Sequence, residues 1–325
     1  MIEKNQTCPR VKQEPGKQGG GIYVTGANAA ILNNIIRNNV SGRGAGIFAD
    51  CPKLVIRGNT VQNNIGVGDH GGGISLFSPN AEISYNRIEG NEIGRDHGYG
   101  WGGGIVVVNK PGIYKFSHNI FTGNFAPSVG SAVFVDDGAV ASMEHDLIYA
   151  NACNPKGDGA VAPVYVDGLE GKYGSTLDMN HVTIADHTCK PAVAGTAISV
   201  TDKSKVTIKN SILWNNGGED IILDETSKAT VTYTLSEKPI KGTGNLSEDP
   251  MFAPGRQYRL RSIIGHWDPS YGTTKVGRWV PDMQHSPAID AADPTSPFDL
   301  EPGPNGSRAN LGYDGNTAQA SKSKQ

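Results

Sequence analysis

The sequence predicts an all-β solenoid, in which short parallel strands wind into a stack of similar coils. Three observations predict it: a glycine-rich corner that recurs along the chain, the alternating strand that follows each corner, and a column of asparagines that recurs with them. Self-similarity at a period of about 20–50 residues is the sequence signature of stacked repeat architectures.

The recurring corner is clearest at positions 71–76, which read Gly-Gly-Gly-Ile-Ser-Leu. Apolar residues alternate with other residues after the glycines, and an alternation of period two in a short run favours a strand over a helix. We call these segments the GGG strands. Copies occur at 19–24, 44–49 and 102–107, with looser copies at 130–135 and 195–200.

The second half of each repeat carries asparagines in fixed places. Asparagine tolerates the left-handed backbone conformation and can bond neighbouring backbone at a turn. Stacked amides can also bond from one coil to the next. We therefore expect a structural ladder that fills a turn, not a ligand site. The last position of the repeat gives the column Asn39, Asn64, Asn91, Asn124, Asn151, His187 and Asn216, at intervals of 25 to 36 residues.

The pattern over residues 19–224 resembles the right-handed parallel β-helix repeats of the pectate-lyase-like superfamily. The resemblance implies a single-stranded right-handed parallel β-helix of about eight rungs. It implies little about function, because that superfamily includes polysaccharide lyases, glycoside hydrolases, epimerases, esterases, phage tailspikes and adhesins. Its Arg-Lys-Ca lyase signature and its Asp-Pro-His-Asp epimerase motif are absent here, so neither activity is carried over.

The ends of the chain depart from the repeat. Residues 2–5 resemble the tail of a repeat, so the chain starts inside a coil, and a solenoid end needs a cover. The sequence 286–293 resembles the C-terminal module of secreted bacterial β-helix proteins. We expect a partial rung and loop at 1–18, the β-helix at 19–224, an irregular cap at 225–318 and a disordered tail at 319–325. A further chain or domain covering the N-terminal end is an expected partner.

Composition excludes some classes of function. The 29 basic and 32 acidic residues give a net charge of -3, which argues against a nucleic-acid-binding face. No apolar run is long enough for a membrane span. The four cysteines form no CxxC pair, so a zinc or redox centre has no support. Cys153 and Cys189 follow the asparagine column by two residues, which leaves a disulfide or two free thiols open.

Insertions that interrupt the repeat are the candidate sites, because insertions in repeat proteins often form the binding face. Two of them, at 65–70 and 92–101, end close to a GGG corner and both contain Asp-His. If the coils stack, these insertions become vertical neighbours. Turn-stabilising hydrogen bonds are the alternative role for such aspartates. The candidate catalytic residues are Asp69, His70, Asp96, His97 and Asp136.

Two chemistries suit these residues. Glycoside cleavage needs two carboxyl groups, about 5 Å apart for retention or about 6.5–9.5 Å apart for inversion of configuration. Asp69 with Asp96 suits the first spacing, and Asp96 with Asp136 suits the second. Uronate β-elimination needs a base and a group that neutralises the substrate carboxylate, which Arg95, His97 and Tyr99 provide, with Ca2+ held by aspartates.

Aromatic side chains in the outward positions of the GGG strands are candidate sugar platforms. If Ile47 and its equivalents face the core, the residue after each faces outward. Asp50, Asp136 and Asp167 fall at the ends of these strands. The outward rings either stack on sugars or lie under the insertions. The candidate substrate-binding residues are Arg95, Tyr99, Trp101, Phe48, Phe134 and Tyr165.

Metal ligands are not assigned, although a bound Ca2+ remains possible. His118, His145 and His181 share one column and are expected to stack as turn fillers more readily than to bind a metal. Carboxylates of the cap form a second, weak Ca2+ candidate, because they lack the spacing of a known calcium loop. These carboxylates are Asp290, Asp293, Asp299, Glu301 and Asp314.

The leading hypothesis is a secreted or cell-surface bacterial enzyme that acts on a polysaccharide, as hydrolase or lyase, in a groove over the GGG strands. The alternatives are a non-catalytic carbohydrate-binding or adhesive module, or a structural fragment of a larger protein. Convergent solvated carboxylates favour the enzyme. Carboxylates bonded to the protein itself favour the alternatives.

Overall fold

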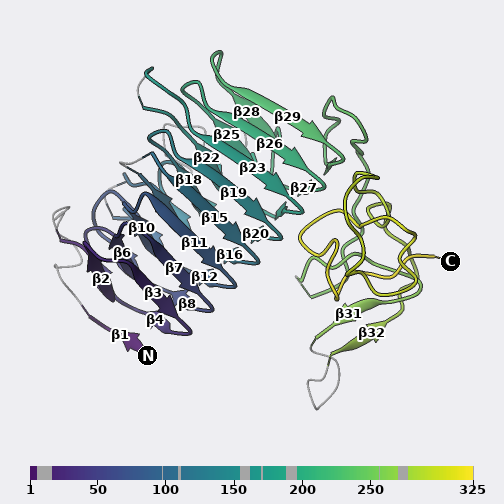
Figure 1. Ribbon diagram of the computed structural model, residues 1–325, viewed down its shortest axis with the longest axis horizontal. Helices are drawn as coiled ribbons and strands as arrows, with labels where there is room; N and C mark the ends of the chain where they lie inside the picture. Colours follow the sequence, from purple (N-terminus) through teal and green to yellow (C-terminus); the bar gives the residue numbers. More distant parts are fainter. Residues whose placement is uncertain are drawn as a thin grey trace.

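The computed structural model describes residues 1–5, 17–96, 98–108, 111–153, 162–169, 171–187, 196–255, 257–269 and 277–324. The described chain is all-β and forms a parallel β-helix with a cap at its C-terminal end (Figure 1). This confirms the predicted fold class. Coils follow one another along the axis in sequence order, and the cap packs against the last of them.

Four parallel sheets and one antiparallel hairpin contain the strands. The sheet of the GGG strands contains β2 (Ile22–Thr25), β6 (Ile47–Asp50), β10 (Ile74–Leu76), β14 (Ile105–Val107), β18 (Val133–Val135), β22 (Val164–Val166), β25 (Ile198–Val200) and β28 (Ile221–Leu223). The following sheet contains β3 (Ala29–Leu32), β7 (Leu54–Arg57), β11 (Asn80–Ser84), β15 (Ile113–Ser117), β19 (Val140–Glu144), β23 (Thr176–Asn180), β26 (Lys205–Lys209) and β29 (Lys228–Thr232); we call it the flat sheet. The third contains β1 (Ile2–Glu3), β4 (Ile35–Arg37), β8 (Thr60–Gln62), β12 (Arg87–Glu89), β16 (Ile120–Thr122), β20 (Leu147–Tyr149), β24 (Thr183–Ala185), β27 (Ile212–Trp214) and β30 (Leu235–Ser236). The fourth contains β5 (Val40–Ser41), β9 (Ile65–Gly66), β13 (Glu92–Ile93), β17 (Phe125–Ala126) and β21 (Ala152–Cys153), and the hairpin is β31 (His266–Asp268) with β32 (Arg278–Val280).

The core fills the inside of the coils, as the alternation predicts. Ile74 pairs with Ile47 on one side and Ile105 on the other, and all three are fully buried in one cluster. Every second residue of the flat sheet also enters this cluster, for example Ile83 and Phe116. Burial of these columns of apolar residues is the main stabilising term of the stack.

Asparagine ladders hold the turns, as predicted. Asn64 accepts hydrogen bonds on Oδ1 from the backbone N and the Nδ2 of Asn39, at 3.0 and 2.9 Å. Its own Nδ2 donates to Oδ1 of Asn91 and to the carbonyl of Ile36. Asn64 is fully buried, and each of its polar groups has a partner, as buried polar groups require. A second ladder runs through Asn59, Asn86, Asn119 and Asp146.

The boundaries differ from the prediction at both ends of the cap. Strands β29 and β30 continue the parallel sheets as far as Ser236, beyond the expected end at 224. Residues near the C-terminus are packed, although their polarity suggested a disordered tail. Ala320 and Ser323 are fully buried, and Ser323 N donates to the carbonyl of Pro304. The tail is ordered by its contacts with the cap.

Candidate active site

The two insertions that carry Asp-His are vertical neighbours. β9 pairs with β13, and the backbone N of Trp101 donates to the carbonyl of Asp69 at 2.8 Å. The stacking of distant segments on one wall, which the site hypothesis requires, is therefore present.

Asp69 is held in an ion pair within the wall. Its two carboxylate oxygens each lie 2.6 Å from the guanidinium of Arg43, and Oδ1 lies 2.8 Å from Nδ1 of His70. Burial opposes the charge, but the bonds from His70 and Arg43 outweigh it and hold the pKa of Asp69 far below its usual range. A carboxylate with both oxygens occupied and so low a pKa is a poor general acid. Arg43, which stands just before its own glycine corner, is the sequence signal for this pairing.

The described candidates of the neighbouring insertion lie toward solvent. Asp96 is exposed, and Arg95 is exposed and bonds to Glu92 while its guanidinium lies 3.9 Å from the ring centre of Phe125. Tyr99 is half-exposed, and its ring meets Trp101 edge-on at 4.7 Å. His97, the remaining candidate of this insertion, lies outside the described residues, as do Cys189 and the side chain of Cys153.

Phe48 and Phe134, in outward positions of the GGG strands, lie under cover, whereas Tyr23 of the first strand is exposed and stacks on Phe48. Phe48 and Phe134 are 4% and 3% exposed, so they offer no sugar platform in this structure. They form a second apolar cluster outside the sheet, together with Phe77, Val106 and Val108, and Trp101 packs against it. The backbone of Trp101 pairs with His70 and Val129 of the neighbouring coils, and its side chain packs on the outer face of the sheet, which the sequence pattern alone does not reveal.

Asp136 lies at the other end of the strands from Asp69 and Asp96. The strands are parallel, so every residue that precedes a GGG strand lies at one edge of the sheet, and every residue that follows one lies at the opposite edge. Asp96 precedes β14, and Asp136 follows β18. The direction of the strands therefore argues against the expected pairing of Asp96 with Asp136.

A different carboxylate pair forms at this second edge. Asp136 and Asp167 directly follow β18 and β22, which pair in register, with Phe134 opposite Tyr165. The backbone N of Asp167 continues the ladder by donating to the carbonyl of Val135 at 2.8 Å. The two residues are therefore about one strand spacing apart, about 4.8 Å. Both are half-buried, and the signal in the sequence was an aspartate at the ends of three GGG strands, at Asp50, Asp136 and Asp167.

The two carboxyl groups of this pair differ in their surroundings. Burial raises the pKa of Asp136 to about 7, with contributions from the charges of Asp137, Asp167 and Asp202. Burial also raises the pKa of Asp167, but Thr201 Oγ1 donates to its Oδ1 at 2.6 Å and the backbone N of Gly168 donates at 2.9 Å. One group is thus suited to carry a proton at neutral pH, and the other is stabilised as a carboxylate by donors.

Tyr165 stands beside this pair on the outer face of the sheet. Its ring meets Phe134 edge-on at 5.7 Å and is only partly buried, unlike the rings of Phe48 and Phe134. Its hydroxyl lies 3.3 Å from Oγ1 of Thr201, which gives its single hydroxyl proton to Asp167. Tyr165 is therefore the predicted platform residue that remains accessible and adjoins carboxylates.

The histidines stack in their column. His118 and His145 lie 4.9 Å apart between ring centres, and His145 and His181 lie 5.2 Å apart. The carboxylates of the cap bond to separate partners, Asp293 to Lys209 and Asp314 to Arg259. Among the residues that the structure describes, no group of three or more His, Cys, Asp or Glu side chains could hold a metal ion.

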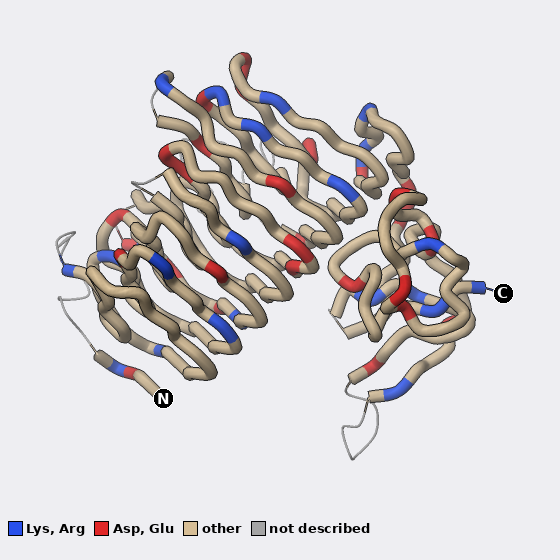
Figure 2. The backbone as a smooth tube through the Cα atoms, in the orientation of Figure 1, with Lys and Arg blue, Asp and Glu red and all other residues tan. Residues whose placement is uncertain are grey.

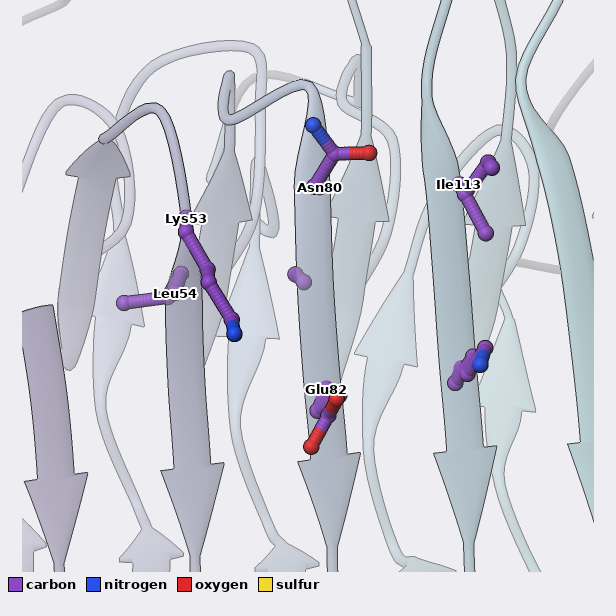
Figure 3. Close-up of a pocket in the computed structure, with 7 residues that line it drawn as sticks. Lys53, Leu54, Asn80, Glu82 and Ile113 are labelled. Carbon is purple, nitrogen blue, oxygen red and sulfur yellow. The ribbon is translucent and has the colours of Figure 1, made fainter. Parts of the chain in front are cut away.

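Described residues also line three clefts away from the GGG strands. Figure 3 shows one cleft on the flat sheet, which has a volume of about 230 Å3. Its lining comes from Lys53 just before β7 and from three neighbouring strands, with Leu54 on β7, Asn80 and Glu82 on β11, and Ile113 on β15. A larger one, of about 410 Å3, crosses β15, β19, β23 and β26 of the same sheet. The third, of about 330 Å3, lies between the coils and the cap. Polar side chains line all three.

Comparison with known families agrees with the geometry. Residues 10–144 match the family described as right handed beta helix region. The chain contains a right-handed β-helix. No curated protein and no solved structure matches the chain. A β-helix is consistent with a carbohydrate-related or a structural module. Among the residues of the chain that the structure describes, no α-helix is long and apolar enough to cross a membrane.

Proposed function

We propose that this β-helix protein is a secreted or cell-surface glycoside hydrolase that cleaves a neutral polysaccharide at Asp136 and Asp167. The observation that carries the proposal is the placement of two aspartates with their backbones one strand spacing apart, directly after paired strands. A separation near 5 Å suits a retaining mechanism, in which one carboxyl group donates a proton and the other attacks the sugar.

The roles follow from the surroundings of each group. Asp136, with its raised pKa, is the general acid that protonates the leaving oxygen. Asp167, held by Thr201 and the Gly168 backbone, is the nucleophile that forms the glycosyl-enzyme bond. Asp136 then returns as the base that activates water. The glycan lies on the outer face of the GGG strands, with a sugar ring against Tyr165.

The charge at this edge favours a neutral substrate over a polyuronate. Asp137, Asp167 and Asp202 all raise the pKa of Asp136 by their charge, which marks a region of negative potential. Such a region repels a uronate chain. Tyr165 is also a weak candidate for the base of a lyase, because burial raises its pKa further. Hydrolysis of a neutral glycan is thus the chemistry that these residues support best.

The proposal is tested on a panel of neutral and acidic polysaccharides, with reducing ends and unsaturated-uronate absorbance measured together. We expect new reducing ends from a neutral polymer and no absorbance. Asp136→Asn and Asp167→Asn should each lower the rate at least about 100-fold, because each removes a group that acts in the transition state. Asp299→Asn, an exposed carboxyl of the cap, is the matched control and should keep full activity.

Non-catalytic carbohydrate binding is the second candidate, favoured by the clefts on the flat sheet, which polar and apolar side chains line together. It takes the place of the hydrolase if a neutral polysaccharide binds but no polymer of the panel releases reducing ends. Release of an unsaturated product would instead contradict the hydrolase and restore the lyase. A bound Ca2+ ion remains a separate proposal, which is tested by the effect of a chelator on activity. A partner at the N-terminal end is another, which is tested by measuring the oligomeric state.

A further inference from the structure

The cleft between the coils and the cap has walls of two kinds. One wall is the turn column of the β-helix, with Tyr85, His118 and His145. The other belongs to the cap, with Arg259, Asp314 and Gln319. Clefts between structural units are frequent ligand sites, and a volume of about 330 Å3 is enough for a small molecule or one unit of a polymer.

The wall from the β-helix is a rigid stack of rings. Tyr85 stacks on His118 at 4.6 Å, His118 lies 4.9 Å from His145, and Arg57 covers the far side of Tyr85 at 5.3 Å. Burial lowers the pKa of His118 and of His145, so both imidazoles are neutral at neutral pH. A neutral imidazole carries one donor and one acceptor.

The wall from the cap is a buried ion pair with an exposed cover. Arg259 is 8% exposed and Asp314 is 6% exposed, and they form a close ion pair. Gln319, whose side chain is exposed, places Oε1 2.7 Å from Nη2 of Arg259. Nε of Arg259 and Oδ2 of Asp314 are buried without a hydrogen-bond partner. Buried polar atoms without partners are rare and indicate a group that the bare chain does not supply.

We infer that this cleft binds one uncharged sugar residue of a glycan, as a site separate from the carboxylate pair. A sugar hydroxyl displaces the exposed amide of Gln319 from Arg259 and bonds the guanidinium, while Asp314 and the neutral histidines receive and donate further hydrogen bonds. The inference rests on the proposed function only for the choice of a glycan as ligand.

The charges in the cleft select for an uncharged polyol. Asp314 already neutralises Arg259, so an anion gains no free positive charge there. The two unpartnered atoms are a donor, Nε of Arg259, and an acceptor, Oδ2 of Asp314. A hydroxyl group can both accept and donate a hydrogen bond, so it suits either atom. A carboxylate or a phosphate only accepts, and it would be repelled by Asp314.

The flat sheet offers a path by which a longer chain leaves the cleft. Its larger hollow is lined by Ser117 and Glu144, which directly precede His118 and His145. Ser142, Asp178 and Thr207 continue that hollow across the neighbouring strands. A glycan seated in the cleft can therefore extend over the flat sheet toward the edge that carries Asp136.

The test measures binding to full-length protein carrying Asp136→Asn, so that cleavage does not interfere. The probes are neutral hexasaccharides of glucose, xylose, mannose and N-acetylglucosamine, with hexagalacturonate as the anionic comparison, titrated calorimetrically. We expect one neutral hexasaccharide to bind. His118→Ala combined with His145→Ala should weaken that binding about tenfold or remove one of two binding sites, because it deletes the hydrogen bonds from the two imidazoles to the ligand. Met283→Ala, a fully exposed side chain of the cap, is the control and should leave binding unchanged.

Three results would overturn the inference: no binding by any neutral hexasaccharide, binding that the double variant leaves unchanged, or hexagalacturonate binding that the double variant removes. The proposed hydrolase fails separately. If Asp136→Asn and Asp167→Asn leave cleavage intact while the double variant weakens binding, the cleft stands and the catalytic assignment falls.

Discussion

The residue that departs most from the asparagine ladders is Asp146. It takes an asparagine position at the end of the second ladder, is fully buried, and accepts on Oδ1 from the N and Nδ2 of Asn119. Its other oxygen has no hydrogen-bond partner. Burial raises its pKa to about 8. The ladder therefore ends in a carboxyl group that is most stable when protonated.

Replacing Asp146 by asparagine should remove a pH dependence of stability. The folded pKa of about 8 lies above the unfolded value of about 3.9, so the stability linked to this group is complete below about pH 4 and is lost as the pH rises toward 8. We expect Asp146→Asn to be more stable than the wild type at pH 8, and the difference to shrink toward pH 4. Denaturant unfolding at pH 4, 6 and 8 measures it.

Asp178→Asn is the control for this comparison. Asp178 is an exposed carboxyl on β23, which pairs with β19, the strand that precedes Asp146. It should leave the pH dependence of unfolding unchanged. Parallel stability curves for the wild type and Asp146→Asn over this range would show that Asp146 is ionised inside the fold at no cost.

At the scale of the element, the glycine corners set how closely coils approach. A Cβ on Gly73 would lie 2.5 Å from the carbonyl oxygen of Gly104 and 3.1 Å from the side chain of Asn91. Both neighbours belong to the adjacent coil, and the first is backbone that cannot move alone. The corner is therefore glycine because of the stack, not because of a turn within one coil.

Gly73→Ala should accordingly separate two coils and destabilise the β-helix by about 1–3 kcal/mol, the usual cost of excess volume in a packed interior. Thermal unfolding should show a lowered midpoint. Hydrogen exchange should rise first in β10 and β14, which meet at this corner. An unchanged midpoint would contradict the close packing of Gly73 on Gly104.

The ends of the GGG strands make a prediction about the pH dependence of catalysis. Asp136 must be protonated to act as the general acid, and its pKa is about 7. Cleavage of the neutral polysaccharide should therefore fall as the pH rises through about 7. Rates measured from pH 5 to 9 test this, and an activity that increases with pH across this range would assign the proton transfer to another group.

The elements were predictable from the sequence, but the partners of the site residues were not. Period-two alternation and the asparagine columns depend on residues stacked upon their own equivalents, so the repeat reveals them directly. The pairing of Asp136 depends on strand direction, which separates it from Asp96 and joins it to Asp167. The burial of Phe48 and Phe134 depends on an outer cluster that includes Phe77 and Trp101, which no repeat encodes.

The whole molecule is a column whose coils contact their neighbours and whose last coils share a core with the cap. The paired strands of each sheet follow sequence order, so each coil is held mainly by the one before and the one after. The cap attaches through a separate apolar cluster that joins Ile212 and Leu235 to Leu260, Ala288 and Leu311. Lys209 with Asp293 adds an ion pair across the same junction. In Figure 2 the charged residues of the coils are distributed along the column, with both signs in the cap.

This arrangement predicts that damage at the junction stays local. Leu260 is 2% exposed in the shared cluster, so Leu260→Ala should cost about 2–5 kcal/mol there through lost burial and a cavity. Stability in a stack of repeats is close to a sum of neighbouring terms. Hydrogen exchange should therefore rise in β27, β30 and the cap while β6 and β10 keep their protection. An equal loss of protection along the whole column would instead mean that the coils and the cap unfold as one cooperative unit.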